Sequence, residues 1–358
     1  MIQRSPKRLA RLLVALALIV TLGLAAVWPP TGGIAFEGGF KSAAIMMYHR
    51  FGEGDHPATN IRLDQFDAHL KELERPIYTV LGLPEIAAKL AAGESLAERT
   101  VGLSADDAYR SVLTEAWPRL KARGLPFTLF VATDAVERGL GGYLTWAEIK
   151  QLADEGVTIG SQTHRHPHLP ALNAEAIRAE LETANTLFER HLGFRPTLLA
   201  YPYGESSRLV QEIAREMGFE AAFGQHSGAA AKAEGALGLF DLPRFPLNEA
   251  YGDMDRFRLA ANAVALPITE VTPADPQVGE QNPPSIGFTL THSLDLLEHL
   301  ACYSSHAGRA AIERLGATRF EIRVEKPFPP GRTRVNCTLP RVDGRWHWFG
   351  RQYYRAPG

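Results

Sequence analysis

Two adjacent carboxylates, Asp106 and Asp107, are the first residues whose types and spacing could support catalysis. They follow the short apolar run Val101–Leu103, which is bounded by polar residues as a buried strand would be. The pair is therefore predicted at the carboxyl end of a strand, where α/β folds place their chemistry. One carboxylate can bind a metal there while the other faces substrate or water. Because two ionised acids this close repel each other, a nearby cation or a shifted pKa is expected.

Three histidines at alternating positions form the second group with chemical potential. His164, His166 and His168 come just after a strand predicted at Val157–Gly160. Burying three imidazole rings in a core would require three sets of hydrogen-bonding partners. Neutral imidazole is, in contrast, the commonest nitrogen ligand of protein-bound metals. The cluster therefore predicts a metal site.

Two further groups also follow predicted strands. The tripeptide Pro202–Gly204 follows Thr197–Tyr201, and His49 follows Ala43–Tyr48. A lone histidine is usually a packing or surface residue, but at the end of a first strand His49 can face the site. The carboxyl ends of parallel strands gather at one rim, so the acids, the histidines and the tripeptide are expected to lie together. Each motif alone is weak, and their convergence carries the prediction.

The elements that must position these residues alternate between strand and helix. Helical periodicity and capping signals predict helices at Leu63–Leu73, Leu83–Leu96, Val112–Ala122, Thr145–Asp154, Ala174–His191 and Leu209–Met217. Additional strands are predicted at Phe127–Thr133 and Ala221–Phe223. Such alternation favours a parallel α/β barrel or a doubly wound sheet.

The amino terminus and the overall composition bear on localisation. Four basic residues precede the uncharged apolar run Leu12–Trp28, a pattern typical of an export signal. No clean Ala-x-Ala site follows, so residues 1–30 are either a cleaved signal or an uncleaved membrane anchor formed by residues 12–28. In both cases the body of the protein is expected to be exported, and this segment is its only expected membrane contact. The net charge of −2 gives no indication of nucleic-acid binding.

The last third of the chain has a different residue pattern. Five prolines between Leu266 and Pro284 predict a linker over residues 266–285. Alternating apolar residues and the turn Asp343–Gly344 then predict a small, mostly β domain over residues 286–358, with one helix or turn near Leu294–Leu300. Trp346 and Trp348 share a strand face there, either as a sugar-stacking platform or as core aromatics.

The chain has two cysteines, Cys302 and Cys337, and both lie in this last domain. They lack the spacing of a metal or redox pair. In an exported protein a disulfide between them is the prediction, and two free buried thiols are the alternative.

The stretch from Ala43 to Arg244 resembles the polysaccharide deacetylase family, the NodB-homology domain of carbohydrate esterases. Ser104–Tyr109 (SADDAY) is similar to the family's T-F-D-D-G-Y motif, and Gln162–Pro167 (QTHRHP) to its H-[ST]-x-x-H motif followed by Pro. Pro202–Gly204 matches the family's P-Y-G. The resemblance implies a distorted (β/α) barrel over residues 41–265.

The resemblance also implies roles for individual residues. Asp106 would be the general base and Asp107 and His166 metal ligands, with the backbone N–H of Tyr203 in the oxyanion hole. The residues expected around the substrate are His49, Pro202, Gly204 and, from the family's late Arg region, Arg244. Leu290–His292 has the letters of the family's closing Leu-x-His motif but lies past the linker.

Gln162 is the main departure from the family pattern, because it occupies the first metal-ligand position. An amide oxygen is a poorer zinc ligand than imidazole and suits harder ions better. Three outcomes are open: His164 or His168 completes the site, the metal is weakly held or is not zinc, or metal and activity are lost. The expected cofactor is a divalent ion, either Zn or a harder ion such as Co, Ni or Mn.

The expected function is a hydrolase that removes N-acetyl groups from an exported or cell-envelope polysaccharide, most simply in a periplasm. A non-catalytic carbohydrate-binding protein, with Trp346 and Trp348 as contacts, is the alternative, and a hydrolase of a small cyclic amide is a third interpretation. A nucleophilic Ser or Cys mechanism has little support, since no G-x-S-x-G motif occurs and both cysteines lie outside the barrel.

Overall fold

The computed structural model describes residues 41–357, and Gly38–Gly358 form one compact unit. The predicted export signal over residues 1–30 therefore lies outside the described residues. Within residues 41–357, none of the helices combines the length and the apolar character that crossing a bilayer requires.

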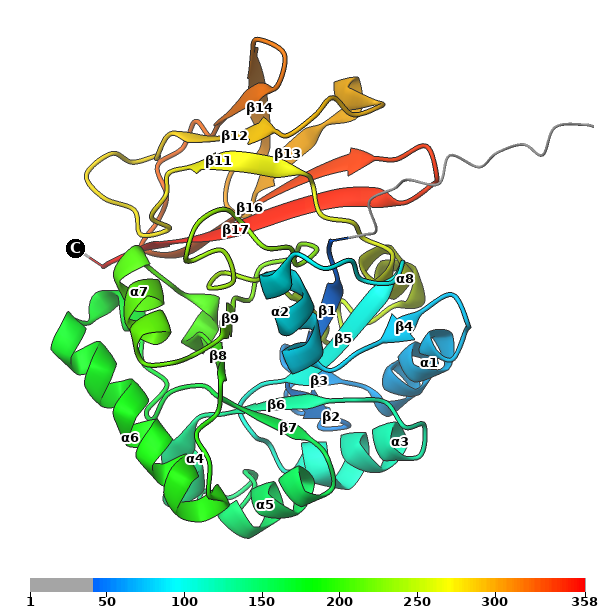
Figure 1. The fold of residues 1–358 in the computed structure, drawn as a ribbon, viewed down its shortest axis with the longest axis vertical. Coiled ribbons are helices and arrows are strands. Elements are labelled where there is room, and N and C mark those ends of the chain that lie inside the picture. The colour runs from blue at the N-terminus through cyan, green and yellow to red at the C-terminus, as the bar shows by residue number, and fades with distance from the viewer. Residues whose placement is uncertain (1–40, 358) are drawn as a thin grey trace, which may run out of the picture. The chain divides into compact units, whose positions relative to one another are not determined.

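An eight-stranded parallel sheet forms the centre of the first part of the chain (Figure 1). Its order is β10–β1–β5–β6–β7–β8–β9, with β4 paired to β5. The strands are β1 (Ala44–Tyr48), β4 (Thr79–Val80), β5 (Thr100–Ala105), β6 (Thr128–Val131), β7 (Thr158–Ser161), β8 (Leu198–Ala200), β9 (Ala221–Phe223) and β10 (Phe245–Pro246). Strands β1, β5 and β6 are buried along their whole length, which explains why their sequences are continuous apolar runs. The sheet curls into the predicted distorted (β/α) barrel.

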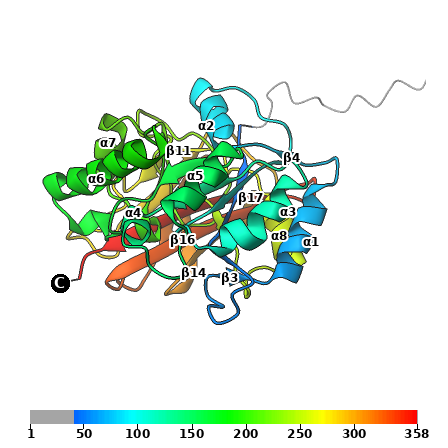
Figure 2. The same ribbon diagram turned by 90° about the horizontal axis from the view of Figure 1, so that it is seen from below.

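Helices cover the outer side of this sheet (Figures 1 and 2). They are α1 (Leu63–Leu73), α2 (Leu83–Ala92), α3 (Trp117–Lys121), α4 (Thr133–Glu137), α5 (Trp146–Asp154), α6 (Ala174–Leu192), α7 (Arg208–Glu216) and α8 (Met254–Ala261). A short ribbon, β2 (Arg50–Phe51) with β3 (Asn60–Ile61), follows β1. The predicted capping box is present at α5, where the Thr145 hydroxyl and the Glu148 carboxylate accept each other's backbone N–H.

Two helices differ from the sequence prediction. Helix α2 stops before Leu96 because Gly93 adopts a left-handed conformation (φ 70°) that caps it. The helix predicted over residues 112–122 is divided into a π-helical turn, Val112–Ala116, and α3. Pro118 has no N–H to donate at this junction, so the regular hydrogen-bond ladder cannot run through it.

A seven-stranded antiparallel sheet follows, in the order β11–β12–β15–β14–β13–β16–β17. Its strands are β11 (Ile268–Thr272), β12 (Ile286–Leu290), β13 (Ala301–Ser304), β14 (Gly308–Leu315), β15 (Arg319–Arg323), β16 (Gly331–Pro340) and β17 (Trp346–Arg355). The stretch predicted as a linker thus contains the edge strand β11. Prolines flank β11 rather than interrupt it, and an edge strand tolerates them there. The helix or turn expected near Leu294–Leu300 is a single 3-10 turn, Leu297–His299.

The long hairpin of β16 and β17 has two different faces. Val335, Cys337 and Leu339 lie in the buried core of the second sheet, whereas the alternate residues of β16 face the barrel. The contact with the barrel is close: a Cβ added at Gly350 would lie 1.8 Å from the Ser227 carbonyl oxygen. The second sheet is therefore packed directly on a barrel loop.

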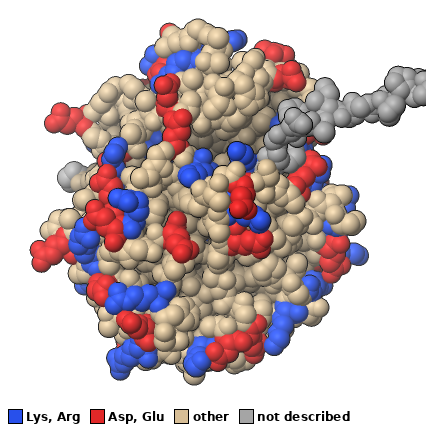
Figure 3. All heavy atoms as spheres, viewed as in Figure 1, with Lys and Arg blue, Asp and Glu red and all other residues tan. Residues whose placement is uncertain are grey.

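Charges of both signs are interspersed over the face drawn in Figure 3. Elsewhere in the described residues, pairs one helical turn apart include Lys150 with Asp154 at 2.8 Å and Arg208 with Glu212 at 3.0 Å. Exposed pairs of this kind contribute only about 0.3–0.5 kcal/mol each. The buried cores of the two sheets therefore account for most of the stability.

A disulfide joins Cys302 to Cys337, which lie directly opposite each other on β13 and β16. The bridge closes a loop with a sequence separation of 35 residues. The chain-entropy model gives about 3–4 kcal/mol for such a loop. We expect chemical denaturation with and without reductant to differ by this amount, and a Cys302→Ala/Cys337→Ala variant to be insensitive to reductant. Equal midpoints for the oxidised and reduced protein would contradict the assignment.

His69 is a fully buried imidazole in the barrel. Its Nδ1 lies 3.1 Å from the Tyr48 hydroxyl, its Nε2 lies 2.8 Å from the Gly252 carbonyl oxygen, and its ring stacks on Phe257. The neutral ring satisfies both contacts by accepting from Tyr48 and donating to Gly252. Burial lowers the pKa of His69 to about 4, although the Gly252 carbonyl and Asp253 act in the opposite direction.

This lowered pKa makes stability depend on pH. The unfolded chain takes up a proton at His69 near pH 6.5, while the folded protein resists it until about pH 4. The free energy of unfolding should therefore fall as pH drops through this window, by up to about 3 kcal/mol from His69. Denaturation of the wild type and a His69→Gln variant between pH 7 and pH 4 should show their stabilities converging. Parallel curves would mean that His69 does not titrate in this way.

Candidate active site

The loops after β1, β5, β7 and β8 come together at one rim of the barrel. The backbone N–H of Asp106 donates to the Tyr48 carbonyl, and the Gln162 side-chain oxygen accepts from the N–H of Asp107 at 3.0 Å. The His166 ring lies 4.5 Å from the Tyr203 ring. The expected gathering of the motifs is therefore present in the structure, with residues from four strand ends in mutual contact.

Asp106 has no exposed surface, and its carboxylate is held by two side chains. Arg244 donates to Oδ1 at 2.7 Å and to Oδ2 at 2.9 Å, and Gln225 Nε2 donates to Oδ2 at 3.2 Å. Burial by itself raises the pKa of Asp106, but Arg244 outweighs it, with smaller contributions from His49 and His166, and the pKa lies below its usual value. Asp106 is therefore ionised at neutral pH.

The position of Arg244 corrects the sequence prediction that it contacts substrate. Its side chain is completely buried, and its Nε donates to the Gly224 carbonyl while both Nη atoms face Asp106. No part of the guanidinium is open to a ligand. Arg244 thus acts through Asp106, which it orients and keeps charged.

Asp107 and His166 form the one close pair among the predicted metal ligands. His166 Nε2 lies 3.6 Å from Asp107 Oδ1, and this buried nitrogen has no hydrogen-bond partner. Burial lowers the pKa of His166 despite the attraction of Asp107 and Asp106, so the ring is neutral, in the form that binds metals. An unpartnered ring nitrogen facing a carboxylate fits a cation held between the two.

The remaining predicted ligands do not complete a set of three. Gln162 Oε1 is occupied by the N–H of Asp107, and its Nε2 is a donor without a partner. His164 Nδ1 lies 2.9 Å from the Thr133 hydroxyl. Within residues 41–357, no group of three or more His, Cys, Asp or Glu side chains could hold a metal ion. Catalytic zinc usually has three protein ligands, so two donors better suit an ion that keeps several waters.

His168 is also turned to other partners. Its Nδ1 lies 2.6 Å from the Glu205 carboxylate, and its ring stacks on the Tyr203 ring at 4.5 Å. Burial raises the pKa of Glu205, partly offset by the hydrogen bond with His168. His168, held by Glu205, therefore packs against the Tyr203 ring. It does not join the Asp107–His166 pair.

The motif loops hold an unusual concentration of left-handed backbone. Non-glycine residues with positive φ include Asp107 (73°), Ala108 (55°), Thr163 (67°), His166 (59°) and Tyr203 (58°). Such conformations cost energy and persist where the surrounding structure over-determines them, often at functional sites. Their clustering in all three motifs makes this rim the candidate functional site.

The turn Pro202–Gly204 presents Tyr203 to the site. Pro202 and Gly204 are buried, so they shape the turn instead of contacting substrate as predicted. Gly204 has a positive φ (69°), and a Cβ there would lie 2.3 Å from the backbone nitrogen of Gln225. Only glycine permits this approach, which brings Gln225 close to Asp106.

The second sheet also reaches the site, a contact that no sequence pattern predicted. Arg332 Nη1 and Gln352 Nε2 both donate to the Tyr203 carbonyl, at 3.2 and 3.0 Å. Arg332 Nε also lies 3.6 Å from Glu205. The two contacts join strands β16 and β17 to a catalytic motif, so the C-terminal sheet is part of the site.

Sequence reasoning missed Gln225, Glu205, Arg332 and Gln352. A local signal existed for two of them: Gln225 follows a strand end after Gly224, and Glu205 directly follows the P-Y-G motif. Arg332 and Gln352 carried none, since they lie more than 120 residues beyond the turn that they contact. His49 acts electrostatically on Asp106 and His166, consistent with its predicted place at this rim.

Replacing Arg244 should lower the stability of the protein, because Arg244 is the counter-ion of the buried Asp106 carboxylate. Arg244→Gln leaves a buried carboxylate without its cation, so we expect a loss of about 3–5 kcal/mol in the free energy of unfolding. The double variant Arg244→Gln/Asp106→Asn should recover part of this loss, because it removes the unpaired charge. Chemical denaturation of the four proteins of this cycle measures the coupling. Additive losses would show that the pair is not coupled.

Comparisons with known proteins agree on one family. The model of the polysaccharide deacetylase family matches residues 93–222. "Putative polysaccharide deacetylase YxkH" of Bacillus subtilis is 27% identical over 195 residues, which cover 54% of this chain and 68% of that protein. The peptidoglycan-N-acetylglucosamine deacetylase of Bacillus cereus is 26% identical over 183 residues, covering 50% of this chain and 64% of that one, just under two thirds.

Solved structures show the same barrel. The Streptococcus pyogenes deacetylase PplD, determined in complex with acetate, superposes with a TM-score of 0.54 at 24% identity, over 59% of this chain and 94% of that one. A de-N-acetylase from Aggregatibacter actinomycetemcomitans gives 0.53 at 17% identity, over 61% and 99%. The barrel therefore has the fold of the polysaccharide deacetylases, and its residues 93–222 are similar to the sequence model of that family.

Proposed function

We propose that this chain removes N-acetyl groups from an exported or cell-envelope polysaccharide, with Asp106 as the general base. The observation that carries the proposal is that two adjacent aspartates have different surroundings. Asp106 is buried and kept ionised by Arg244, while its neighbour Asp107 faces the neutral ring of His166. One carboxylate is thus available for proton transfer and the other for cation binding.

The substrate class is supported by the relatives. The Bacillus cereus relative is named for N-acetylglucosamine in peptidoglycan, a polymer in which each acetyl group is held by an amide bond. We extend this chemistry, and not that particular polymer, to the present chain. We also place the activity outside the cytoplasm, because the first residues have the pattern of an export signal and a disulfide joins β13 to β16.

The side chains at the rim account for the proton movements of amide hydrolysis. Asp106 accepts a proton from water as the water oxygen bonds to the acetyl carbon. The backbone N–H of Tyr203 donates to the developing oxyanion, a contribution worth roughly 3 kcal/mol in comparable sites. When the C–N bond breaks, the proton held by Asp106 passes to the leaving nitrogen, which yields acetic acid, a free amine and the original carboxylate; the acid then ionises to acetate by giving its proton to the amine or to water.

A divalent ion between Asp107 and His166 would polarise the amide carbonyl and lower the pKa of the attacking water. Arg244 keeps Asp106 charged until it takes the proton from water, and Arg332 and Gln352 hold the Tyr203 carbonyl so that the turn keeps a fixed direction. Every residue in this scheme is fixed by at least one contact to a different strand or loop.

Acetate release from N-acetylglucosamine oligomers tests the proposal directly. The purified chain should release acetate, lose this activity with a chelator, and regain it with one added divalent ion. Asp107→Asn and His166→Ala should each reduce turnover at least 100-fold, in line with the loss of a metal ligand. His164→Ala is the matched control, because that ring contacts Thr133 instead of Asp107, and it should retain most of the activity.

Two outcomes would contradict the proposal. Unchanged turnover in both Asp107→Asn and His166→Ala would remove the cation-binding role of the pair. Oligomer binding without acetate release under any ion would instead support the non-catalytic glycan-binding alternative.

A further inference from the structure

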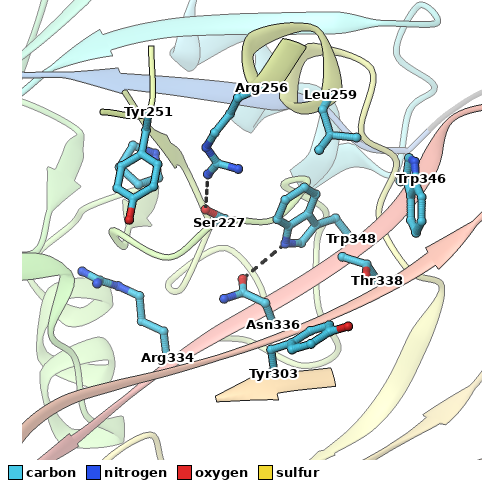
Figure 4. Close-up of a pocket in the computed structure, with 11 residues that line it drawn as sticks. Ser227, Tyr251, Arg256, Leu259, Tyr303, Arg334, Asn336, Thr338, Trp346 and Trp348 are labelled. Carbon is cyan, nitrogen blue, oxygen red and sulfur yellow. Dashed lines mark hydrogen bonds between the residues drawn. The ribbon is translucent and has the colours of Figure 1, made fainter. Parts of the chain in front are cut away.

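A cavity of about 500 Å³ lies between the barrel and the face of the C-terminal sheet (Figure 4). Its barrel side comes from α8 and the loop before it, including Tyr251 and Arg256, and its other side comes from β13, β16 and β17. None of the motif residues of the candidate active site lines it. It is therefore a separate site.

Aromatic rings form much of its wall. Tyr251, Tyr303 and Trp346 are 53%, 46% and 36% exposed, respectively, which is high for such large side chains in a folded protein. Trp348 is held in place by an edge-to-face contact with Phe245 and by donating from Nε1 to the Asn336 oxygen at 3.2 Å. Figure 4 shows these rings surrounding the cavity. Rigid aromatic faces with a few polar groups among them suit the flat, apolar faces of sugar rings.

Two arginines give the cavity a definite charge preference. Arg256 donates to the Ser227 hydroxyl at 3.4 Å, and its buried Nε has no partner. Arg334 donates from Nε to the Gln352 side chain at 3.0 Å. Within residues 41–357, neither guanidinium forms an ion pair with a carboxylate. Burial lowers the pKa of both groups, and Arg332 lowers that of Arg334 further; Tyr251, with Asp253 for Arg256 and Glu205 for Arg334, acts in the opposite direction.

Partly buried cations without a counter-ion favour an anionic ligand. A guanidinium presents several N–H donors in a planar fork that matches a carboxylate. A neutral sugar would leave both charges desolvated and unpaired, which is costly. The combination of exposed rings and unpaired arginines is therefore selective for a ring that carries an acid.

We propose that this cavity binds a carboxylate-bearing sugar unit of the polysaccharide. The proposal rests on the proposed function for the nature of the polymer, and it adds that the polymer is acidic. Strand β16 connects the two sites: Arg332 contacts the Tyr203 carbonyl, Arg334 and Asn336 line the cavity, and alternate residues share one face. From Arg332 to Asn336 the strand spans about 13 Å, so one glycan chain can occupy both sites.

Binding of defined oligosaccharides to the full chain tests the proposal. The probe is a hyaluronan hexasaccharide, in which glucuronate alternates with N-acetylglucosamine. Its carboxyl-reduced form and a chitin hexamer serve as neutral comparisons. Calorimetry should show at least tenfold tighter binding of the acidic probe. Arg256→Gln and Trp346→Ala should each weaken that binding about tenfold, because each removes one direct contact.

A matched control separates this effect from net charge. Arg190→Gln removes the same charge from the exposed surface of α6 and should leave binding unchanged. Thermal unfolding of each variant establishes that it is folded. Trp346 is partly exposed, so the Trp346→Ala variant is expected to fold.

The test distinguishes this proposal from the catalytic one. His166→Ala should abolish acetate release but still bind the acidic probe, so the two proposals can fail independently. Equal affinity for acidic and neutral probes, or unchanged affinity in Arg256→Gln, would overturn the acidic-sugar site even if acetate release were intact.

Discussion

The buried ion pair of Asp106 and Arg244 is the interaction on which the rest of the site depends. Two fully buried charges are tolerated only when each is paired and hydrogen-bonded, and here Gly224 and Gln225 complete the set. The pair joins the end of β5 to the segment before β10, 138 residues away. It thereby links β5 to the edge strand β10 and fixes one carboxylate in its charged form, while Arg244 also reaches the Gly224 carbonyl just after the opposite edge strand, β9.

The C-terminal sheet is structurally inseparable from this site. It supplies Arg332 and Gln352 to the Tyr203 carbonyl and packs without an intervening side chain at Gly350. Tyr203 adopts a left-handed conformation, and such a conformation needs support from several directions. The sheet provides that support and, on the same face, half of the aromatic cavity. One sheet thus supports a left-handed turn at the candidate active site and forms part of the neighbouring cavity.

Gln162 illustrates how one substitution changes a site without dismantling it. The amide takes a buried position and gives its oxygen to the Asp107 N–H, so it fixes the loop that carries the second acid. Its remaining group is a donor and cannot bind a cation. Gln162 therefore adds no ligand for a cation, but it holds the loop in a geometry that keeps Asp107 beside His166. Of the three outcomes considered for Gln162, completion by His164 or His168 is not favoured, because residues 41–357 contain no group of three or more His, Cys, Asp or Glu side chains that could hold a metal ion.

Local sequence was sufficient for the barrel strands other than the short β4 and β10, for most helices, for the capping box at Thr145 and for the resemblance to deacetylases. Apolar runs, periodicity and capping are short-range properties that need no knowledge of partners. The resemblance had already paired His166 with Asp107, and the structure places the two side chains 3.6 Å apart. Tertiary structure alone decided that the Gln162 side chain holds the Asp107 N–H. It also decided that Arg244 serves Asp106 instead of substrate, that β11 belongs to a sheet, and that β16 reaches the catalytic turn. These outcomes depend on contacts between residues far apart in the chain, and no local pattern encodes which distant group will fill a buried charge's need for a partner.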